Sequence, residues 1–228
     1  MDASVISKLL ISTEIPLLPG DTAMWLALHA GWAIVLGSGM LLLAGKLATG
    51  YRWSMTLLVV LWTLLPGTVS PAYWLGLAFQ SPSLASDVIC LGWLLRSVRR
   101  RRETADLPPQ WDPRALKILW ATGIALGWCL LLDTLALFQF SLYACGFGAS
   151  AFAVVLAAAA ALWLLLGSAA SALPLAVLAL FALSRLPTGN VWDALLDPGL
   201  WLALQIGWLL SVVRRLWVAR RWSAATRA

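Results

Sequence analysis

Long apolar runs separated by short polar breaks make up most of this chain. The clearest block covers residues 53–102: an apolar run, a break at Pro66 and Gly67, an aromatic segment, a second break at Ser81 and Pro82, and a closing apolar run that ends in arginines. A transmembrane helix needs about 20 mostly apolar residues to cross about 30 Å of hydrocarbon. The pattern therefore predicts several membrane-spanning helices joined by short turns.

Applied along the whole chain, this rule predicts an all-α integral membrane protein, a bundle of about seven transmembrane helices. The predicted spans are residues 22–46, 53–70, 82–98, 115–138, 149–166, 173–186 and 199–213. The fifth and sixth are separated at the turn-like sequence GSAASALP, because the apolar stretch around it is too long for one span. The third, sixth and seventh spans are short, so totals of six or eight stay open.

Serine or aspartate followed by proline marks several predicted helix starts. The side chain caps the first turn, and proline at the first helical position gives up an N–H that has no partner there. Ser70 with Pro71 predicts a short helix at 71–79, whose aromatic residues favour the membrane interface. Ser81 with Pro82 predicts the start of the third span. Further starts are predicted at Asp112, Asn190 and Asp197.

Composition excludes an ordinary soluble protein. Hydrophobic residues make up 61% of the 228 residues, charged residues only 11%, and the mean hydropathy is +0.86. The formal net charge of +6 does not indicate nucleic-acid binding, because the cations stand at the ends of apolar runs, where cytoplasmic membrane anchors occur.

The basic clusters predict an orientation. If Arg99 to Arg102 are cytoplasmic, seven alternating spans place the N-terminus outside and the C-terminus inside. Of the 16 Lys and Arg residues, all except Lys8 and Arg185 then lie inside. Residues 1–21 form an extracytoplasmic segment, 99–114 a cytoplasmic basic loop and 216–228 a basic tail. Short basic turns favour a bacterial inner membrane.

Similar motifs recur in the two halves of the chain. Leu65-Pro66-Gly67-Thr68 is matched by Leu186-Pro187-Thr188-Gly189, and Gly92-Trp93-Leu94-Leu95 by Gly207-Trp208-Leu209-Leu210. We interpret residues 22–98 and 147–215 as two three-helix repeats joined by a connecting helix at 115–138, which gives a parallel 3+1+3 plan. The alternative is that shared hydropathy and helix-end preferences produced the likeness without duplication.

A few polar side chains fall inside the predicted spans, where they are costly and by default face a bundle interior or a cavity. The candidates for one outward-facing polar pocket are His29, Asp87, Asp133, Arg185 and Gln205. The first three lie roughly 8 to 11 Å from the outer ends of their spans, as estimated from the helix rise. The alternative is that each reaches headgroups and water, or makes one interhelical hydrogen bond.

The sequence gives little support for catalysis. Cys90, Cys129 and Cys145 form no metal-ligand spacing, the single histidine cannot ligate haem as a pair, and nucleotide-binding and hydrolase motifs are absent. We therefore predict no cofactor and no metal, and an enzyme is the less favoured class.

Two functional hypotheses remain. The first is a non-catalytic inner-membrane subunit or scaffold that binds lipid or lateral membrane partners, either another protein or further copies of itself. The second is a small transporter or lipid-handling protein that uses the outward-facing pocket. The first is favoured, because transporters place their binding sites near the midplane and this midplane is almost bare of polar groups. The sequence names neither cargo nor partner.

Overall fold

The computed structural model describes residues 18–102 and 112–225, and every regular element in these two stretches is helical. The longer helices are α2 (Asp21–Leu43), α3 (Thr49–Thr63), α5 (Leu84–Arg102), α6 (Pro113–Thr134), α8 (Ala149–Leu166), α9 (Ala169–Ser184) and α11 (Pro198–Ala225). The shorter ones are η1 (Ala44–Lys46), η2 (Gly67–Val69), α4 (Pro71–Phe79), α7 (Leu142–Cys145) and α10 (Val191–Leu195). The predicted all-α class is confirmed for these residues.

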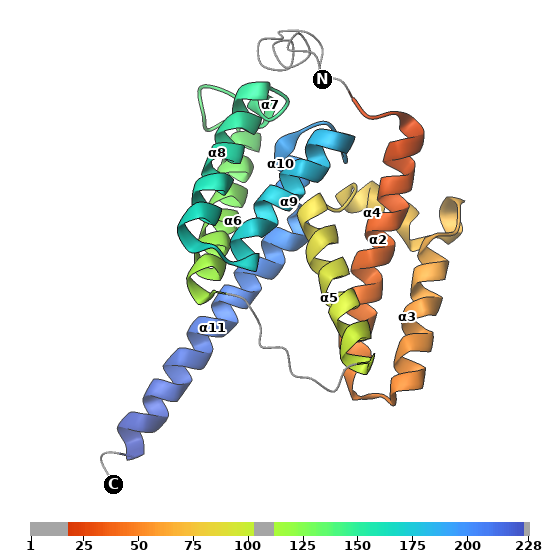
Figure 1. Ribbon diagram of the computed structural model, residues 1–228, viewed down its shortest axis with the longest axis vertical. Helices are drawn as coiled ribbons and strands as arrows, with labels where there is room; N and C mark the ends of the chain where they lie inside the picture. The colour runs from red at the N-terminus through yellow and green to blue at the C-terminus, as the bar shows by residue number, and fades with distance from the viewer. Residues whose placement is uncertain (1–17, 103–111, 226–228) are drawn as a thin grey trace.

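Two groups of helices follow one another along the chain (Figure 1). In the first group α2 runs downward in this view, α3 returns upward, the short α4 follows, and α5 runs downward again. In the second group α8 runs downward, α9 returns, the short α10 follows, and α11 runs downward. Helix α6, which follows the first group and precedes the second along the chain, runs upward, so that corresponding helices of the two groups point in the same direction.

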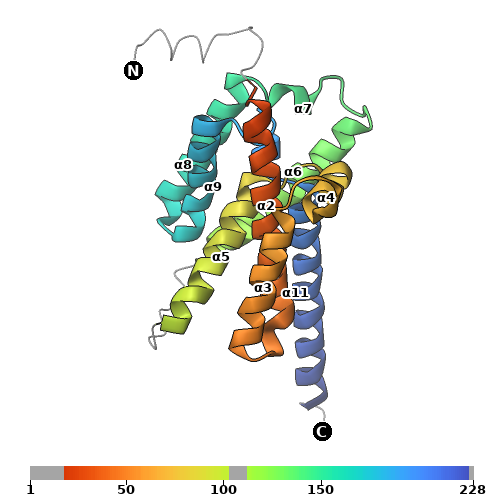
Figure 2. The ribbon, with the colours of Figure 1, turned by 90° about the vertical axis from the view of Figure 1, so that its right-hand side faces the viewer.

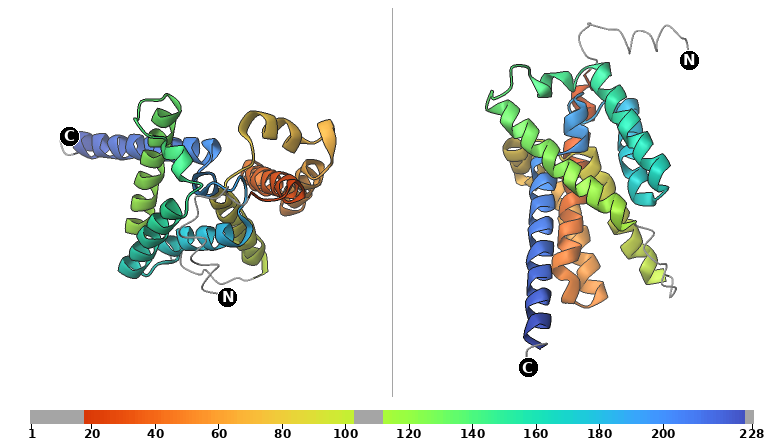
Figure 3. Two further views of the ribbon diagram at one scale, coloured as in Figure 1. Left: turned by 90° about the horizontal axis from the view of Figure 1, so that it is seen from above. Right: turned by 90° about the vertical axis from the view of Figure 1, so that its left-hand side faces the viewer.

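The two groups pack differently. Helix α5 lies along α2, whereas α11 crosses the connecting helix α6 (Figure 3). Helix α5 also contacts α9 and α10 and thereby joins the groups. The turn between α8 and α9 lies higher in Figure 1 than the turn between α2 and α3, and α11 extends below the other helices (Figure 2). Corresponding helices of the two groups therefore do not end at the same height.

Helix α2 contacts neighbours on two faces, and small residues make both contacts close. A Cβ atom on Gly37 would lie 2.8 Å from Cγ2 of Val60 in α3. On the next residue the Ser38 hydroxyl donates to the Cys90 carbonyl of α5 over 3.2 Å. Small residues at helix contacts are the usual means by which membrane helices approach one another, since lipid supplies no hydrophobic drive between them.

Local capping explains most helix starts. The side chains of Ser70, Asp112 and Asn190 accept hydrogen bonds from backbone N–H groups two residues further on, at 2.9 to 3.1 Å. These predicted starts are confirmed. The predicted start at Ser81 is wrong: α5 begins at Leu84, and the Ser83 hydroxyl accepts from the Ser86 N–H over 3.1 Å. Pro82 thus precedes the helix instead of opening it.

Two predicted spans end earlier than expected. Helix α3 ends at Thr63 and not near residue 70, because Pro66 disfavours helical backbone angles at the residue that precedes it. Helix α6 ends at Thr134 and not at 138, where Ala136 takes a positive φ of 55° and turns the chain toward α7. A break between α8 and α9 was expected within GSAASALP, and it lies at Gly167, which is left-handed, and Ser168, which caps α9. The predicted start of this span at residue 173 is wrong, because α9 begins at Ala169 and contains Pro174.

In the part of the chain that the structure describes, four helices are long and apolar enough to cross a membrane: Asp21–Lys46, Pro113–Thr134, Ala149–Leu166 and Pro198–Trp217. Helix α9 is apolar but shorter. The outward faces of these helices carry many exposed apolar side chains, including Leu165, which is 81% exposed, and Leu183, which is 87% exposed. Soluble proteins rarely expose apolar surface over such large areas. This surface indicates a membrane-embedded protein.

Helices α6 and α11 meet at two glycines. Gly123 and Gly127 lie one turn apart on one face of α6. A Cβ atom on Gly123 would lie 2.7 Å from Cδ1 of Leu204, and one on Gly127 would overlap the Trp201 indole. That indole donates to the Ile124 carbonyl over 3.3 Å. The missing side chains therefore make the recess that holds Trp201.

Substitution of Gly127 tests this crossing. We expect Gly127→Ala to destabilise the purified protein by about 1–3 kcal/mol, because the added methyl group displaces a packed indole. Reversible unfolding in detergent measures the change. Gly39→Ala is the matched control, since a Cβ atom there meets nothing within 4 Å. Equal stability of the two variants would contradict the described packing.

Candidate functional site

The starts of α5 and α11 meet inside the bundle although 114 residues separate Ser83 from Asp197. Each start follows a short non-helical connection, which joins α4 to α5 in the first group and α10 to α11 in the second. The first turn of any helix presents N–H groups without helical acceptors and carries partial positive charge. Two such ends brought together need an acceptor of negative charge.

The Asp197 carboxylate serves both helix starts. Its Oδ1 accepts from the Leu200 N–H of α11 over 2.8 Å. Its Oδ2 accepts from the Ser83 N–H over 2.9 Å, from the Ser83 hydroxyl over 2.7 Å, and from the Ser86 hydroxyl. Ser83 and Ser86 are buried. One side chain therefore caps its own helix and fixes the start of α5.

A second carboxylate, that of Asp87, lies one turn into α5. A Cβ atom on Gly31 of α2 would lie 3.1 Å from each of its oxygens, so that only glycine leaves room for the carboxylate there. Its Oδ1 atom is buried and has no hydrogen-bond partner. We call Ser83, Ser86, Asp87 and Asp197 the interior polar cluster. The Asp87 Oδ1 atom is thus the oxygen of the cluster that is buried without a hydrogen-bond donor.

His29 lies on α2 near this cluster but on another side of the helix. It is two residues from Gly31, which corresponds to about 200° of helix rotation. Its Nδ1 donates to the Trp25 carbonyl over 3.0 Å, and its ring lies 4.1 Å from that of Trp25. Its Nε2 is buried without a hydrogen-bond partner. The structure therefore does not pair His29 with Asp87.

Asp133 lies at the exposed end of α6, away from the interior polar cluster. It accepts from the Leu142 N–H over 3.0 Å, from the Tyr143 N–H over 2.7 Å and from the Ser141 hydroxyl over 3.3 Å. It thus holds the start of α7, an element that the sequence analysis did not predict.

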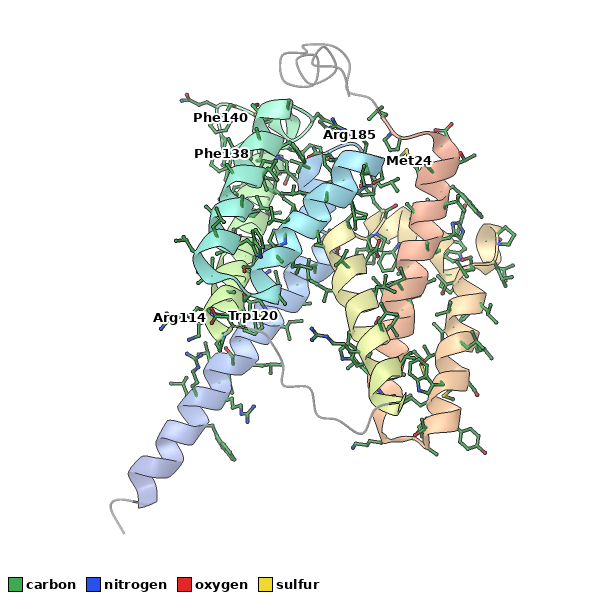
Figure 4. The ribbon with its side chains drawn as sticks, in the orientation of Figure 1. Met24, Arg114, Trp120, Phe138, Phe140 and Arg185 are labelled. Carbon is green, nitrogen blue, oxygen red and sulfur yellow. The ribbon has the colours of Figure 1, made fainter. Side chains whose placement is uncertain are left out.

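Arg185 and Gln205 occupy two further places. Arg185 ends α9 with a positive φ of 56°, and its guanidinium lies 5.4 Å from the centre of the Phe181 ring. Figure 4 shows Arg185 near the upper end of the helices, well above Arg114. Gln205 lines a groove between α6 and α11. The five predicted residues are therefore distributed over α2, α5, α6, α11 and the end of α9, and within the described residues no hydrogen bond joins any two of them.

Hydrogen bonds also fasten α7 to α10 at the end of the bundle that carries Arg185. The Tyr143 hydroxyl donates to Asp193 over 2.7 Å, and the Trp192 indole donates to the Leu142 carbonyl over 2.9 Å. Burial, followed by the bond to the Asp193 carboxylate, raises the pKa of Tyr143. The phenol therefore stays protonated at neutral pH and acts as a structural donor.

A cavity of 440 Å³ opens beside the interior polar cluster. Ala85, Leu196 and Leu200 line it next to the cluster, and the facing sides of α6, α8 and α9 close it. Among its lining residues Thr122 alone carries a hydroxyl, and the indole N–H of Trp192 is already bound within the protein. The cavity is within the roughly 300–1,000 Å³ typical of small-molecule pockets.

Sequence reasoning assigned Asp197 a local role as a helix start and missed its second role. Its partners Ser83 and Ser86 are more than 100 residues away, at 114 and 111 positions. The available signal was a third pair of similar motifs, Ser81-Pro82-Ser83 and Asp197-Pro198-Gly199, which lies between the two motif pairs described above. Matched positions of two parallel units can meet at the axis between them.

Comparison with known proteins adds no functional evidence. No known protein family, curated protein or solved structure matches this chain. Within residues 18–102 and 112–225, no group of three or more His, Cys, Asp or Glu side chains could hold a metal ion.

Asp197→Ala tests whether this carboxylate joins the two helix groups. We expect a loss of about 2–4 kcal/mol in unfolding free energy, because four donors lose a charged acceptor in the bundle interior. Asp112→Ala is the matched control: Asp112 also precedes a proline and caps a helix, but at an exposed site. It should cost about 1 kcal/mol. Similar losses in both variants would contradict the joining role.

Proposed function

We propose that this protein is a non-catalytic multi-pass scaffold of a bacterial inner membrane that binds membrane lipid in the cavity between its helix groups. The apolar cavity carries this proposal. Water is an unfavourable occupant of this apolar cavity, because a buried water molecule needs two to four polar partners. Hydrocarbon fits its lining, and an acyl chain is the hydrocarbon that a membrane supplies.

The helix arrangement supports a seven-span orientation with the N-terminus outside. Besides the four long apolar helices, α3, α5 and α9 run alongside them in alternating directions (Figure 1). The turn with Lys46, the end of α5, the start of α6 with Arg114 and the end of α11 lie toward one side of the molecule. Positive charge prefers the cytoplasmic side.

The parallel helix order also supports the 3+1+3 plan. The first and second groups share the sequence of a long helix, a returning helix, a short helix and a final long helix. In a parallel pair of units the final helices α5 and α11 are counterparts, and their starts are joined through Asp197. The cavity then lies where the two units and the connecting helix α6 meet.

Ala158→Trp tests the lipid cavity. Ala158 lines the cavity, so that an indole there occupies the space of the acyl chain. We expect native mass spectrometry of the protein, extracted mildly from membranes, to show one bound lipid fewer than in the wild type. Ala157→Trp is the matched control, because Ala157 is exposed on α8 and does not line the cavity.

An unchanged number of bound lipids in Ala158→Trp would contradict lipid binding in the cavity. A stoichiometric protein that copurifies with the wild type would instead identify the scaffold as a subunit of that assembly.

Cysteine labelling tests the orientation. Cys145 is exposed in α7, at the end assigned to the outside. We expect a membrane-impermeant maleimide to label it in intact spheroplasts. A Cys145→Ser, Gly45→Cys variant moves the exposed thiol to the turn after α2, where labelling should require permeabilised membranes. The reverse pattern would invert the proposed topology.

A second candidate function is transport, and Asp87 favours it. An unsatisfied buried carboxylate beside two helix breaks is a feature of sites that carry ions or protons through membrane bundles. The lipid-binding scaffold is preferred, because the cavity next to Asp87 is lined by hydrocarbon and not by polar groups.

A further inference from the structure

We propose that the groove between α6 and α11 binds one anionic phospholipid, with the phosphate between Lys117 and Arg215 and one acyl chain along a wall of tryptophans. The groove has a volume of 830 Å³ and is distinct from the interior cavity. Ile124 and Ala125 of α6 line the groove, whereas Gly123 and Leu126 line the cavity. The inference rests on the proposed membrane location but not on lipid in the cavity.

The register of the two helices places the charged residues at one end. Helix α6 rises while α11 descends, and the two cross in Figure 3. The crossing is fixed where Trp201 packs on Gly127 and where a Cβ atom on Gly207 would lie 3.5 Å from Trp120. Lys117 lies about one turn below Trp120, and Arg215 about two turns beyond Gly207 in the same direction. Both cations therefore lie at the lower mouth of the groove.

The length of the groove matches one leaflet of a bilayer. From Lys117 to Trp128, the lining residues of α6 cover about 16 Å at 1.5 Å per residue. Half of a hydrocarbon core of about 30 Å is about 15 Å. A lipid with its phosphate at Lys117 can therefore lay one acyl chain along the groove to the depth of Trp128.

The charges at the mouth are complementary to a phosphate. Lys117 and Arg215 are exposed, and within the described residues the structure has no hydrogen bond from either side chain. Ammonium and guanidinium groups are the usual protein ligands of phosphate oxygens. The mouth lies at the end of α6 that carries Arg114, the side assigned to the cytoplasm (Figure 4), where anionic lipids give the leaflet its negative surface potential.

The groove itself is suited to a hydrocarbon chain. Trp128 and Trp208 remain 47% and 53% exposed where they line it, although their helices are in contact. Trp120 lies on α6 close to the crossing with α11 (Figure 4). Ala121 and Ala125, one turn apart, leave the floor between these rings shallow and smooth. The half-covered rings and the small floor residues form a channel for one chain.

Lipid competition on the full chain tests this site. The purified protein is titrated with phosphatidylglycerol and phosphatidylcholine, and native mass spectrometry measures the retained lipid. We expect the wild type to prefer phosphatidylglycerol. Lys117→Gln with Arg215→Gln should reduce this preference by about ten- to thirty-fold, on the basis of the usual contribution of each surface cation. The control pair, Lys46→Gln with Arg214→Gln, removes the same charge outside the groove and should leave most of the preference.

A second variant distinguishes binding of the lipid in the groove from non-specific attraction of an anionic lipid to the two cations. Ala125→Trp keeps both cations but fills the floor, and we expect it to release the phosphatidylglycerol. Ala158→Trp fills the interior cavity and should leave phosphatidylglycerol bound. Equal losses in the test and control charge pairs, or retention of phosphatidylglycerol by Ala125→Trp, would overturn the site.

Discussion

The Asp197 carboxylate is the interaction on which the arrangement of the two helix groups depends. It accepts from the first turn of its own helix and from three donors at the start of α5. In the hydrocarbon core no water is available to accept a hydrogen bond from an unpaired backbone N–H or hydroxyl group. Each such unpaired group would therefore reduce the folding stability by about 1–3 kcal/mol. The two helix starts can therefore be buried together only with this acceptor between them. Its negative charge also opposes the positive ends of both helix dipoles.

This junction determines where lipid-accessible space remains. Helix α5 is fixed at its start and runs along α2, whereas α11 leaves the same point and crosses α6 at Gly123 and Gly127. The divergence leaves an apolar cavity on one face of α6 and a groove with a basic mouth on the other. A bundle with so small a buried core gains stability from whatever fills these spaces, which connects its packing to the proposed binding of lipid.

The sequence predicted local features well and long-range ones poorly. Starts at Ser70, Asp112 and Asn190 were predictable because a cap acts over two residues. The start of α5 was missed by two residues because Ser83 is held by Asp197 from the other group. Likewise α7 depends on Asp133, ten positions before Tyr143. The similar depth of His29 and Asp87 in the membrane was not enough to predict a shared pocket. The two side chains do not face each other, because His29 lies on another side of α2 than Gly31, the residue that contacts Asp87.

A double-mutant cycle between Ser86 and Asp197 tests the junction most directly. Unfolding free energies are measured in detergent for Ser86→Ala, Asp197→Asn, the double variant and the wild type. If the two side chains are bonded across the groups, the double variant loses less stability than the two single variants together, by about 1–2 kcal/mol. Additive losses, within about 0.5 kcal/mol, would contradict the junction and the arrangement of α5 and α11 built on it.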